Sequence, residues 1–115
     1  MEEQFEEAGI DIVVVSADPE AKAAADLAEF GWSFPLCYDL SEAQMRDLGV
    51  YVTDPLSPEE TDRRFAEPAV FGIKADGTVQ LVCLSNGPAA RPDLVELLDG
   101  MIFNITNDRP TRGLA

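Results

Sequence analysis

The pattern of apolar and polar positions along the chain predicts an alternation of helices and strands. Residues 10–16 are β-branched and almost continuously apolar, which is typical of a strand covered on both faces. Residues 1–8 have the character of the last turns of a helix, and residues 18–31 of a second helix that ends at Gly31. A short strand is predicted at residues 34–38.

The remaining pattern predicts a helix, a hairpin and a final helix. Residues 41–44 form a capping-box pattern, which indicates the start of a helix. Residues 51–66 are predicted to be a long connection. The segments 68–73 and 79–84 have the pattern of strands, and the Asp-Gly step between them predicts an antiparallel hairpin. The last helix is expected to start at Pro92.

This order of elements, β-α-β followed by β-β-α, is similar to that of a thioredoxin fold. We therefore expect a single α/β domain over residues 1–115, a thioredoxin-like three-layer sandwich with flanking helices around a central mixed sheet of about four strands. Such a fold normally begins with a strand and a helix that carries the redox cysteine. Because only the end of that helix is recognised, we expect the domain to be incomplete at its N-terminus.

The charge of the chain excludes several classes of partner. The sequence has 22 acidic residues against 8 basic ones, a formal net charge of −14. Such a field repels phosphate backbones and anionic lipid surfaces, so we expect neither nucleic acid nor membrane as a partner. No basic, apolar leader opens the chain, and we expect a cytoplasmic protein.

The residue inventory also limits the chemistry. The chain has no histidine, which excludes Ser-His-Asp and Cys-His nucleophile systems and the usual zinc sites. Two cysteines in a chain of this size do not make a disulfide framework. We expect no metal and no cofactor.

Four segments in a characteristic order resemble the peroxiredoxin-like branch of the alkyl hydroperoxide reductase/thiol-specific antioxidant family. They are Gly9-Ile10-Asp11-Ile12-Val13-Val14-Val15-Ser16-Ala17-Asp18, Glu67-Pro68-Ala69-Val70-Phe71-Gly72-Ile73, Ala75-Asp76-Gly77-Thr78-Val79 and Ala90-Arg91-Pro92-Asp93-Leu94. The closing segment 107–113 also resembles the tail of that branch. The resemblance implies an antioxidant thiol peroxidase whose attacking cysteine lies upstream of residue 1, and a chain that is inactive alone. Whether the chain itself is an enzyme stays open.

The same resemblance implies that this chain keeps the residues of one side of a redox site. We call this side, made by Glu67, Pro68, Asn86 and Arg91, the wall around Pro68. In thioredoxin-like folds a proline in the place of Pro68 forms a cis peptide bond and faces the redox cysteine, so we expect a cis bond here; the alternative is a trans proline at the first residue of a strand. The antiparallel hairpin should bring Asn86 and Arg91 beside Pro68. Arg91 could stabilise a thiolate or polarise a peroxide, or be a solvated residue. Glu67 argues against peroxidase chemistry, because a carboxylate raises the pKa of a nearby thiol.

The cysteines and aromatic residues are interpreted as structural. Cys83 alternates with core positions on a strand, and Cys37 has no basic neighbour in the sequence, so neither is a strong candidate for a redox thiol. Trp32, Phe34 and Phe71 are expected in the core, with a ligand platform as the alternative.

A second interpretation is that the whole chain is a non-catalytic, degenerate thioredoxin-like domain used for homodimerisation or for binding a partner. The strand at residues 10–16 would have one uncovered flank, and an uncovered flank pairs readily with another chain. This reading predicts a homodimer that buries this edge and face.

Overall fold

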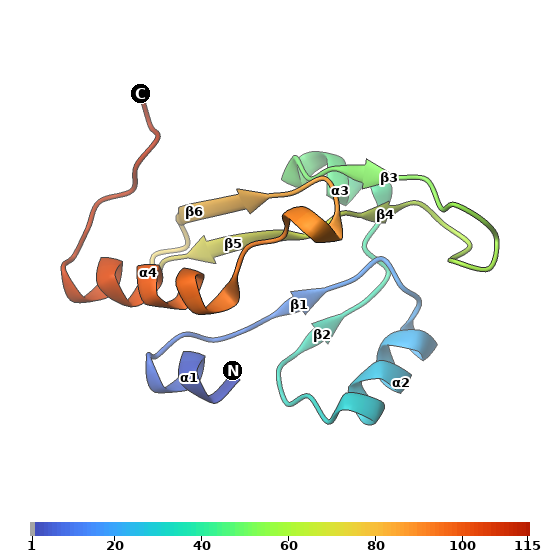
Figure 1. The fold of residues 1–115 in the computed structure, drawn as a ribbon, viewed down its shortest axis with the longest axis horizontal. Coiled ribbons are helices and arrows are strands. Elements are labelled where there is room, and N and C mark those ends of the chain that lie inside the picture. Colours follow the sequence, from blue (N-terminus) through green and yellow to red (C-terminus); the bar gives the residue numbers. More distant parts are fainter. Residues whose placement is uncertain (1) are drawn as a thin grey trace. The chain divides into compact units, whose positions relative to one another are not determined.

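The structure is a computed structural model that describes residues 2–115, so Met1, the first residue of the predicted N-terminal helix, lies outside the described residues. The chain divides into two compact units (Figure 1). The first ends at Glu67, and the second runs from Pro68 to Ala115. Each unit is described by itself below. Among the described residues, no helix has both the length and the apolar character that crossing a membrane requires.

The first unit alternates short helices and strands. Its elements are α1 (Glu2–Glu7), β1 (Val14–Val15), α2 (Glu20–Phe30), β2 (Leu36–Cys37), α3 (Glu42–Leu48), β3 (Val52–Thr53) and β4 (Phe65–Ala66). The second unit is a hairpin followed by a helix. Its elements are β5 (Ala69–Ile73), β6 (Val79–Leu84), a 3₁₀ turn (Pro88–Ala90) and α4 (Leu94–Thr106).

The strands of the described chain pair two by two, where a central sheet of about four strands was predicted. β1 pairs with β2 in parallel, β3 with β4 antiparallel, and β5 with β6 antiparallel. The β1–β2 ladder is short for a local reason. Val14 N–H donates to the carbonyl of Pro35, but continuing the ladder toward Ile12 would need an N–H from residue 35, which proline lacks.

Two helix starts follow directly from capping side chains. The predicted capping box of α3 is confirmed: Gln44 N–H donates to Ser41 Oγ at 3.1 Å, and Ser41 N–H donates to Gln44 Oε1 at 2.9 Å. The last helix starts at Leu94 and not at Pro92 as predicted, because the carboxylate of Asp93 caps it by accepting hydrogen bonds from the N–H groups of Val95 and Glu96.

The predicted hairpin is confirmed, with Ala69 opposite Leu84 and Phe71 opposite Val82. Gly77 supplies the positive φ that its turn requires, at 87°. The predicted connection 51–66, in contrast, contains two strands. β3 and β4 escaped detection because each has only two residues, too few to show a period of two.

The buried core of the described residues is small. The buried apolar side chains are Phe5, Ala17, Ala23, Met45, Val50 and Leu98. Val13 and Val15 are 59% and 50% exposed, so the prediction that residues 10–16 are covered on both faces is wrong. Continuous β-branched sequence shows strand preference, but whether a second layer covers the strand depends on distant residues.

Candidate functional site

The expected wall around Pro68 is built by the hairpin of the second unit. The Glu67–Pro68 peptide bond is trans, so the prediction of a cis bond is wrong. A trans proline fits here because residue 68 stands just before β5, where its missing N–H interrupts no ladder. The carbonyl of Pro68 accepts two hydrogen bonds from Ser85, from Oγ at 2.6 Å and from N–H at 3.1 Å.

Ser85 is a residue that the sequence reasoning missed. It is 6% exposed, and its double hydrogen bond joins the end of β6 to the residue before β5. The predicted antiparallel register, which sets the end of β6 beside the start of β5, is confirmed, and it brings Ser85, the residue before Asn86, to Pro68. A lone serine at a strand end has no distinctive sequence signal, so only the register could have found it.

Arg91 lies between the 3₁₀ turn and α4, and its N–H donates to the carbonyl of Pro88. Asn86 and Arg91 are both exposed. Within the described part of the chain, no carboxylate forms a salt bridge with Arg91. Its guanidinium is therefore available to an external anion.

Glu67 closes the first unit, where its N–H donates to the carbonyl of Tyr51 at 2.8 Å. The residue is 9% exposed. The β3–β4 ladder and this hydrogen bond hold the backbone of Glu67 in place, so a structural role accounts for its position.

The two cysteines are free thiols in strands. Cys37, in β2, is exposed, and Cys83, in β6, is partly buried. Neither lies at a helix N-terminus, and among the described residues no hydrogen bond reaches either thiol. These surroundings lack the positive potential that activates a thiolate.

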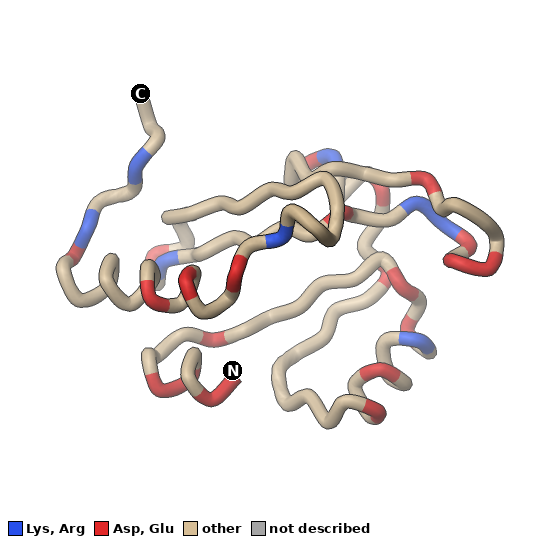
Figure 2. The backbone as a smooth tube through the Cα atoms, viewed as in Figure 1, with Lys and Arg blue, Asp and Glu red and all other residues tan. Residues whose placement is uncertain are grey.

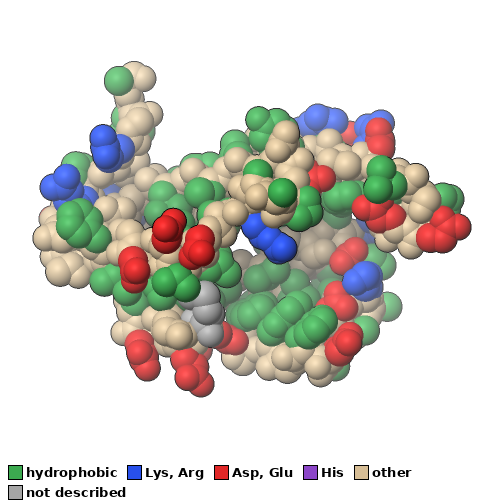
Figure 3. Space-filling view, viewed as in Figure 1, with side chains coloured by type: hydrophobic (Ala, Val, Ile, Leu, Met, Phe, Trp, Pro, Cys, Tyr) green, Lys and Arg blue, Asp and Glu red, His purple; other side chains and the backbone are tan. Residues whose placement is uncertain are grey.

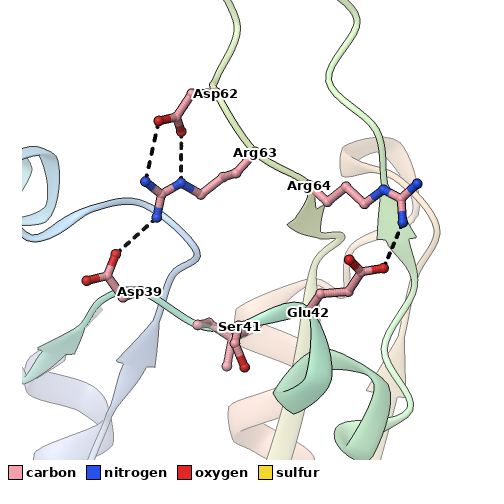
Figure 4. Close-up of a pocket in the computed structure, with 7 residues that line it drawn as sticks. Asp39, Ser41, Glu42, Asp62, Arg63 and Arg64 are labelled. Atoms are coloured by element: carbon pink, nitrogen blue, oxygen red, sulfur yellow. Dashed lines mark hydrogen bonds and ion pairs between the residues drawn. The ribbon is translucent and has the colours of Figure 1, made fainter.

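Two consecutive arginines, also missed from the sequence, line a cleft of about 430 Å³ in the first unit. Figure 4 shows them pointing in different directions, each toward acidic side chains. The cleft is lined by Asp39, Leu40, Ser41, Glu42, Asp62, Arg63 and Arg64. An Arg-Arg pair in a chain with 8 basic residues is the signal that could have drawn attention to them.

Arg63 joins the connection before β4 to the C-terminal ends of β1 and β2. Its guanidinium donates to the carbonyl of Ala17 at 3.2 Å, to Asp39 at 3.0 Å and to Asp62 at 2.8 Å. The hydrogen bond to Asp62 is the main cause that raises the pKa of Arg63. With most of its donors engaged, Arg63 acts as a tether for this connection.

Arg64 binds Asp54 at 2.7 Å and Glu42 at 2.8 Å, and Glu42 also accepts from Arg46 at 3.1 Å. The hydrogen bond from Arg64, followed by that from Arg46, lowers the pKa of Glu42. Carboxylates thus compensate the positive charges of the two arginines in this cleft. The cleft is therefore suited to hold the segment before β4 in place, and not to stabilise a thiolate.

The described residues contain no group of three or more His, Cys, Asp or Glu side chains placed to hold a metal ion. The ion pairs of the arginine cleft bring together titratable groups from distant parts of the first unit. The geometry of the second unit instead offers an exposed arginine, and a proline carbonyl fixed by Ser85. These features can bind and orient a reactant, while a nucleophile activated for attack is not evident among the described side chains.

Comparison with known proteins identifies the relatives of this chain. The profile of the AhpC/TSA family matches residues 1–82. The crystal structure of a cysteine-to-serine mutant of peroxiredoxin 6 from Arenicola marina, in its orthorhombic form, is similar with a TM-score of 0.66 and 21% sequence identity. The similarity covers 91% of this chain and 50% of that chain. No curated protein matches the chain.

The two findings agree with the order of elements. The structural likeness shows that the fold is thioredoxin-like α/β, and this chain spans about half the length of the peroxiredoxin that it matches. The family profile covers well over half of the chain, including all strands up to the middle of β6. The chain therefore belongs to the AhpC/TSA family.

Proposed function

We propose that this chain is part of a thiol-dependent peroxide reductase. The observation that carries the proposal is the match of the AhpC/TSA family over residues 1–82. In such a reaction a cysteine thiolate attacks one oxygen of the peroxide, an S–O bond forms and the O–O bond breaks. The leaving oxygen takes a proton, and the resulting sulfenic acid is returned to the thiol by two equivalents of a thiol reductant, which form a disulfide and release water.

In this proposal the second unit supplies one wall of the reaction site. The carbonyl of Pro68 is fixed by Ser85, and Arg91 has an exposed guanidinium that can bind the peroxide or the thiolate. Asn86 adds an amide donor next to Ser85.

The attacking thiol is neither Cys37 nor Cys83 in this proposal, because both lie in strands without a cation or a helix N-terminus at the sulfur. We therefore expect the purified 115-residue chain to show no peroxide consumption above buffer. The measurement is the loss of hydrogen peroxide, and of an organic hydroperoxide, in the presence of dithiothreitol.

The controls are the variants Cys37→Ser and Cys83→Ser, which should give the same baseline as the unmodified chain. Robust thiol-dependent turnover that disappears in either variant would show that this chain carries its own nucleophile. The DNA upstream of the Met1 codon provides an independent test. An in-frame strand followed by a cysteine at a helix start supports the peroxidase, and an in-frame stop codon supports the second candidate below.

The second candidate function is homodimerisation by a non-catalytic domain, and the exposure of β1 favours it. Val13 is 59% exposed and Val15 is 50% exposed. Within the described residues, β2 is the one ladder partner of β1, so the other flank of β1 has free backbone groups. Strand pairing by a second copy would satisfy these groups and cover the valines.

This candidate predicts a dimer by light scattering at high protein concentration and high salt, where the repulsion between two chains of net charge −14 is screened. Val15→Glu should shift the equilibrium to monomer, because it buries a charge in the contact. Val82→Glu, at a similarly exposed valine of β6, is the matched control and should leave the dimer intact. A monomer at every concentration contradicts this candidate.

A further inference from the structure

Three aromatic side chains after α2 form one continuous stack. The rings of Phe30 and Trp32 are nearly parallel, with centroids 4.9 Å apart and planes inclined by 20°. Trp32 and Phe34 continue the arrangement at 5.4 Å and 25°. Both separations lie in the range where aromatic rings attract each other. We call Phe30, Trp32 and Phe34 the aromatic stack.

The aromatic stack lies at the surface, although Trp32 and Phe34 were predicted to be in the core. Phe30 is 58% exposed and Trp32 is 37% exposed, while Phe34 is partly buried. The prediction of a core position is therefore wrong for Trp32. Figure 3 shows hydrophobic side chains gathered over α2 and β2 on the visible face. Exposed groups of large apolar side chains mark interaction surfaces more often than scattered single ones do.

The backbone beneath the aromatic stack is held on both sides. Gly31, with φ 64°, caps α2 and donates its N–H to the carbonyl of Leu27 at 3.0 Å. Ser33 Oγ donates to the carboxylate of Glu2 in α1, and Pro35 accepts a hydrogen bond from Val14 N–H. The backbone that carries the three rings is thus fixed before any ligand arrives, which reduces the entropy lost on binding.

The charges beside the aromatic stack are negative. Glu29 precedes Phe30, Asp26 lies one helical turn before it, and Glu2 is bonded to Ser33. Lys22, the basic residue of α2, is engaged by Asp26 at 2.9 Å and by Asp18 at 3.7 Å. Figure 2 shows this excess of acidic positions along α1 and α2.

The combination of aromatic faces with carboxylates selects a cationic ligand. A guanidinium or ammonium group is attracted by the face of a ring, and the surrounding carboxylates strengthen that attraction. Arg109, placed 5.8 Å from the ring centroid of Phe103 in α4, shows the same contact elsewhere in this molecule. Nucleic acid would also stack on aromatic rings, but its phosphates are repelled by a chain of net charge −14.

We propose that the aromatic stack is a docking site for an arginine-bearing segment of a partner protein. The planar guanidinium lies on the outer face of Phe30, the exposed end of the stack, because the inner faces of the rings cover one another. Glu29 and its acidic neighbours compensate its charge. The proposal does not depend on peroxide chemistry, and it concerns a surface separate from the wall around Pro68.

The chain contains its own reporter for this test, because Trp32 is its single tryptophan. The probe is a capped ten-residue peptide of alternating arginine and glycine, titrated into the full chain at low salt. We expect a saturable change in tryptophan fluorescence that weakens as salt is added. A peptide of alternating glutamate and glycine should produce no such change.

Two variants of Phe30 separate cation–π binding from simple hydrophobic contact. Phe30→Ala and Phe30→Leu should each weaken binding of the arginine peptide by on the order of fivefold. Phe103→Ala removes a phenylalanine of similar exposure (55%) from α4 and should leave the affinity unchanged. Glu29→Gln should weaken binding by a smaller factor, because it removes one compensating charge. Circular dichroism checks that each variant is folded.

The proposal is overturned by an absent fluorescence response, by equal binding of the glutamate peptide, or by full affinity in a folded Phe30→Leu variant. The last result would show that the surface needs apolar volume and no aromatic face. A folded Phe103→Ala variant that loses binding would move the site to the second unit and overturn it equally.

Discussion

Replacing Met45 with alanine is expected to lower the free energy of unfolding by about 2–5 kcal/mol. Met45 is 1% exposed and is the largest fully buried side chain among the described residues. It projects from α3, whose start is set by the capping box and whose end is set by Gly49. Truncation removes buried apolar surface and leaves a cavity that this short helix cannot close by itself.

The measurement is urea denaturation followed by the fluorescence of Trp32, which lies in the same unit. Leu48→Ala, in the same helix, is the matched control. Leu48 is 48% exposed, so its truncation should cost well under half as much. Equal losses for the two variants would mean that Met45 is not the centre of this core.

Replacing Gly72 with alanine is expected to destabilise the hairpin by about 1–3 kcal/mol. A Cβ at this position would lie 2.7 Å from Cγ of Leu81 and 3.2 Å from both of its δ carbons. Gly72 is opposite Leu81 in the β5–β6 ladder, and the register shifts by one residue directly after it. The methyl group therefore meets a side chain that its own cross-strand pairing holds in place.

Gly100→Ala is the matched control, because the same change is made where nothing lies within 4 Å of the added Cβ. Gly100 is inside α4, where alanine should stabilise the helix by about 0.5–1 kcal/mol. Thermal unfolding followed by circular dichroism should thus show opposite shifts for the two glycines. A shift in the same direction for both would contradict the close approach of Leu81 to Gly72.

The features that could be predicted from the sequence depend on neighbours in the chain. Ser41 and Gln44 are three residues apart, so their capping box forms in any context that allows a helix. The turn at Asp76-Gly77 has the same local character, with Thr78 N–H donating to the Asp76 carboxylate at 2.9 Å. The hairpin register that follows from this turn brought Ser85 to Pro68.

The candidate site could be predicted only in part. Pro68 and the end of β6 were placed together, because a hairpin fixes that neighbourhood. The trans bond before Pro68 was only the alternative in the sequence prediction, because the expected cis bond rested on the resemblance to thioredoxin-like folds and not on the backbone around Pro68. The arginine cleft was missed for another reason: Arg63 reaches Asp39 and Ala17 across 24 and 46 residues, and no local pattern encodes such contacts.

Sequence patterning is sufficient to place α2, α3, the hairpin and α4, and to indicate a thioredoxin-like order, because hydrogen bonds between near neighbours start and stop these elements. Exposure is a different kind of property. Whether Val13, Trp32 or Cys37 faces water depends on which distant segment covers it, and the same apolar pattern fits either outcome. Long-range packing therefore left Trp32 at the surface, where it is part of the aromatic stack, and buried Met45 in the core.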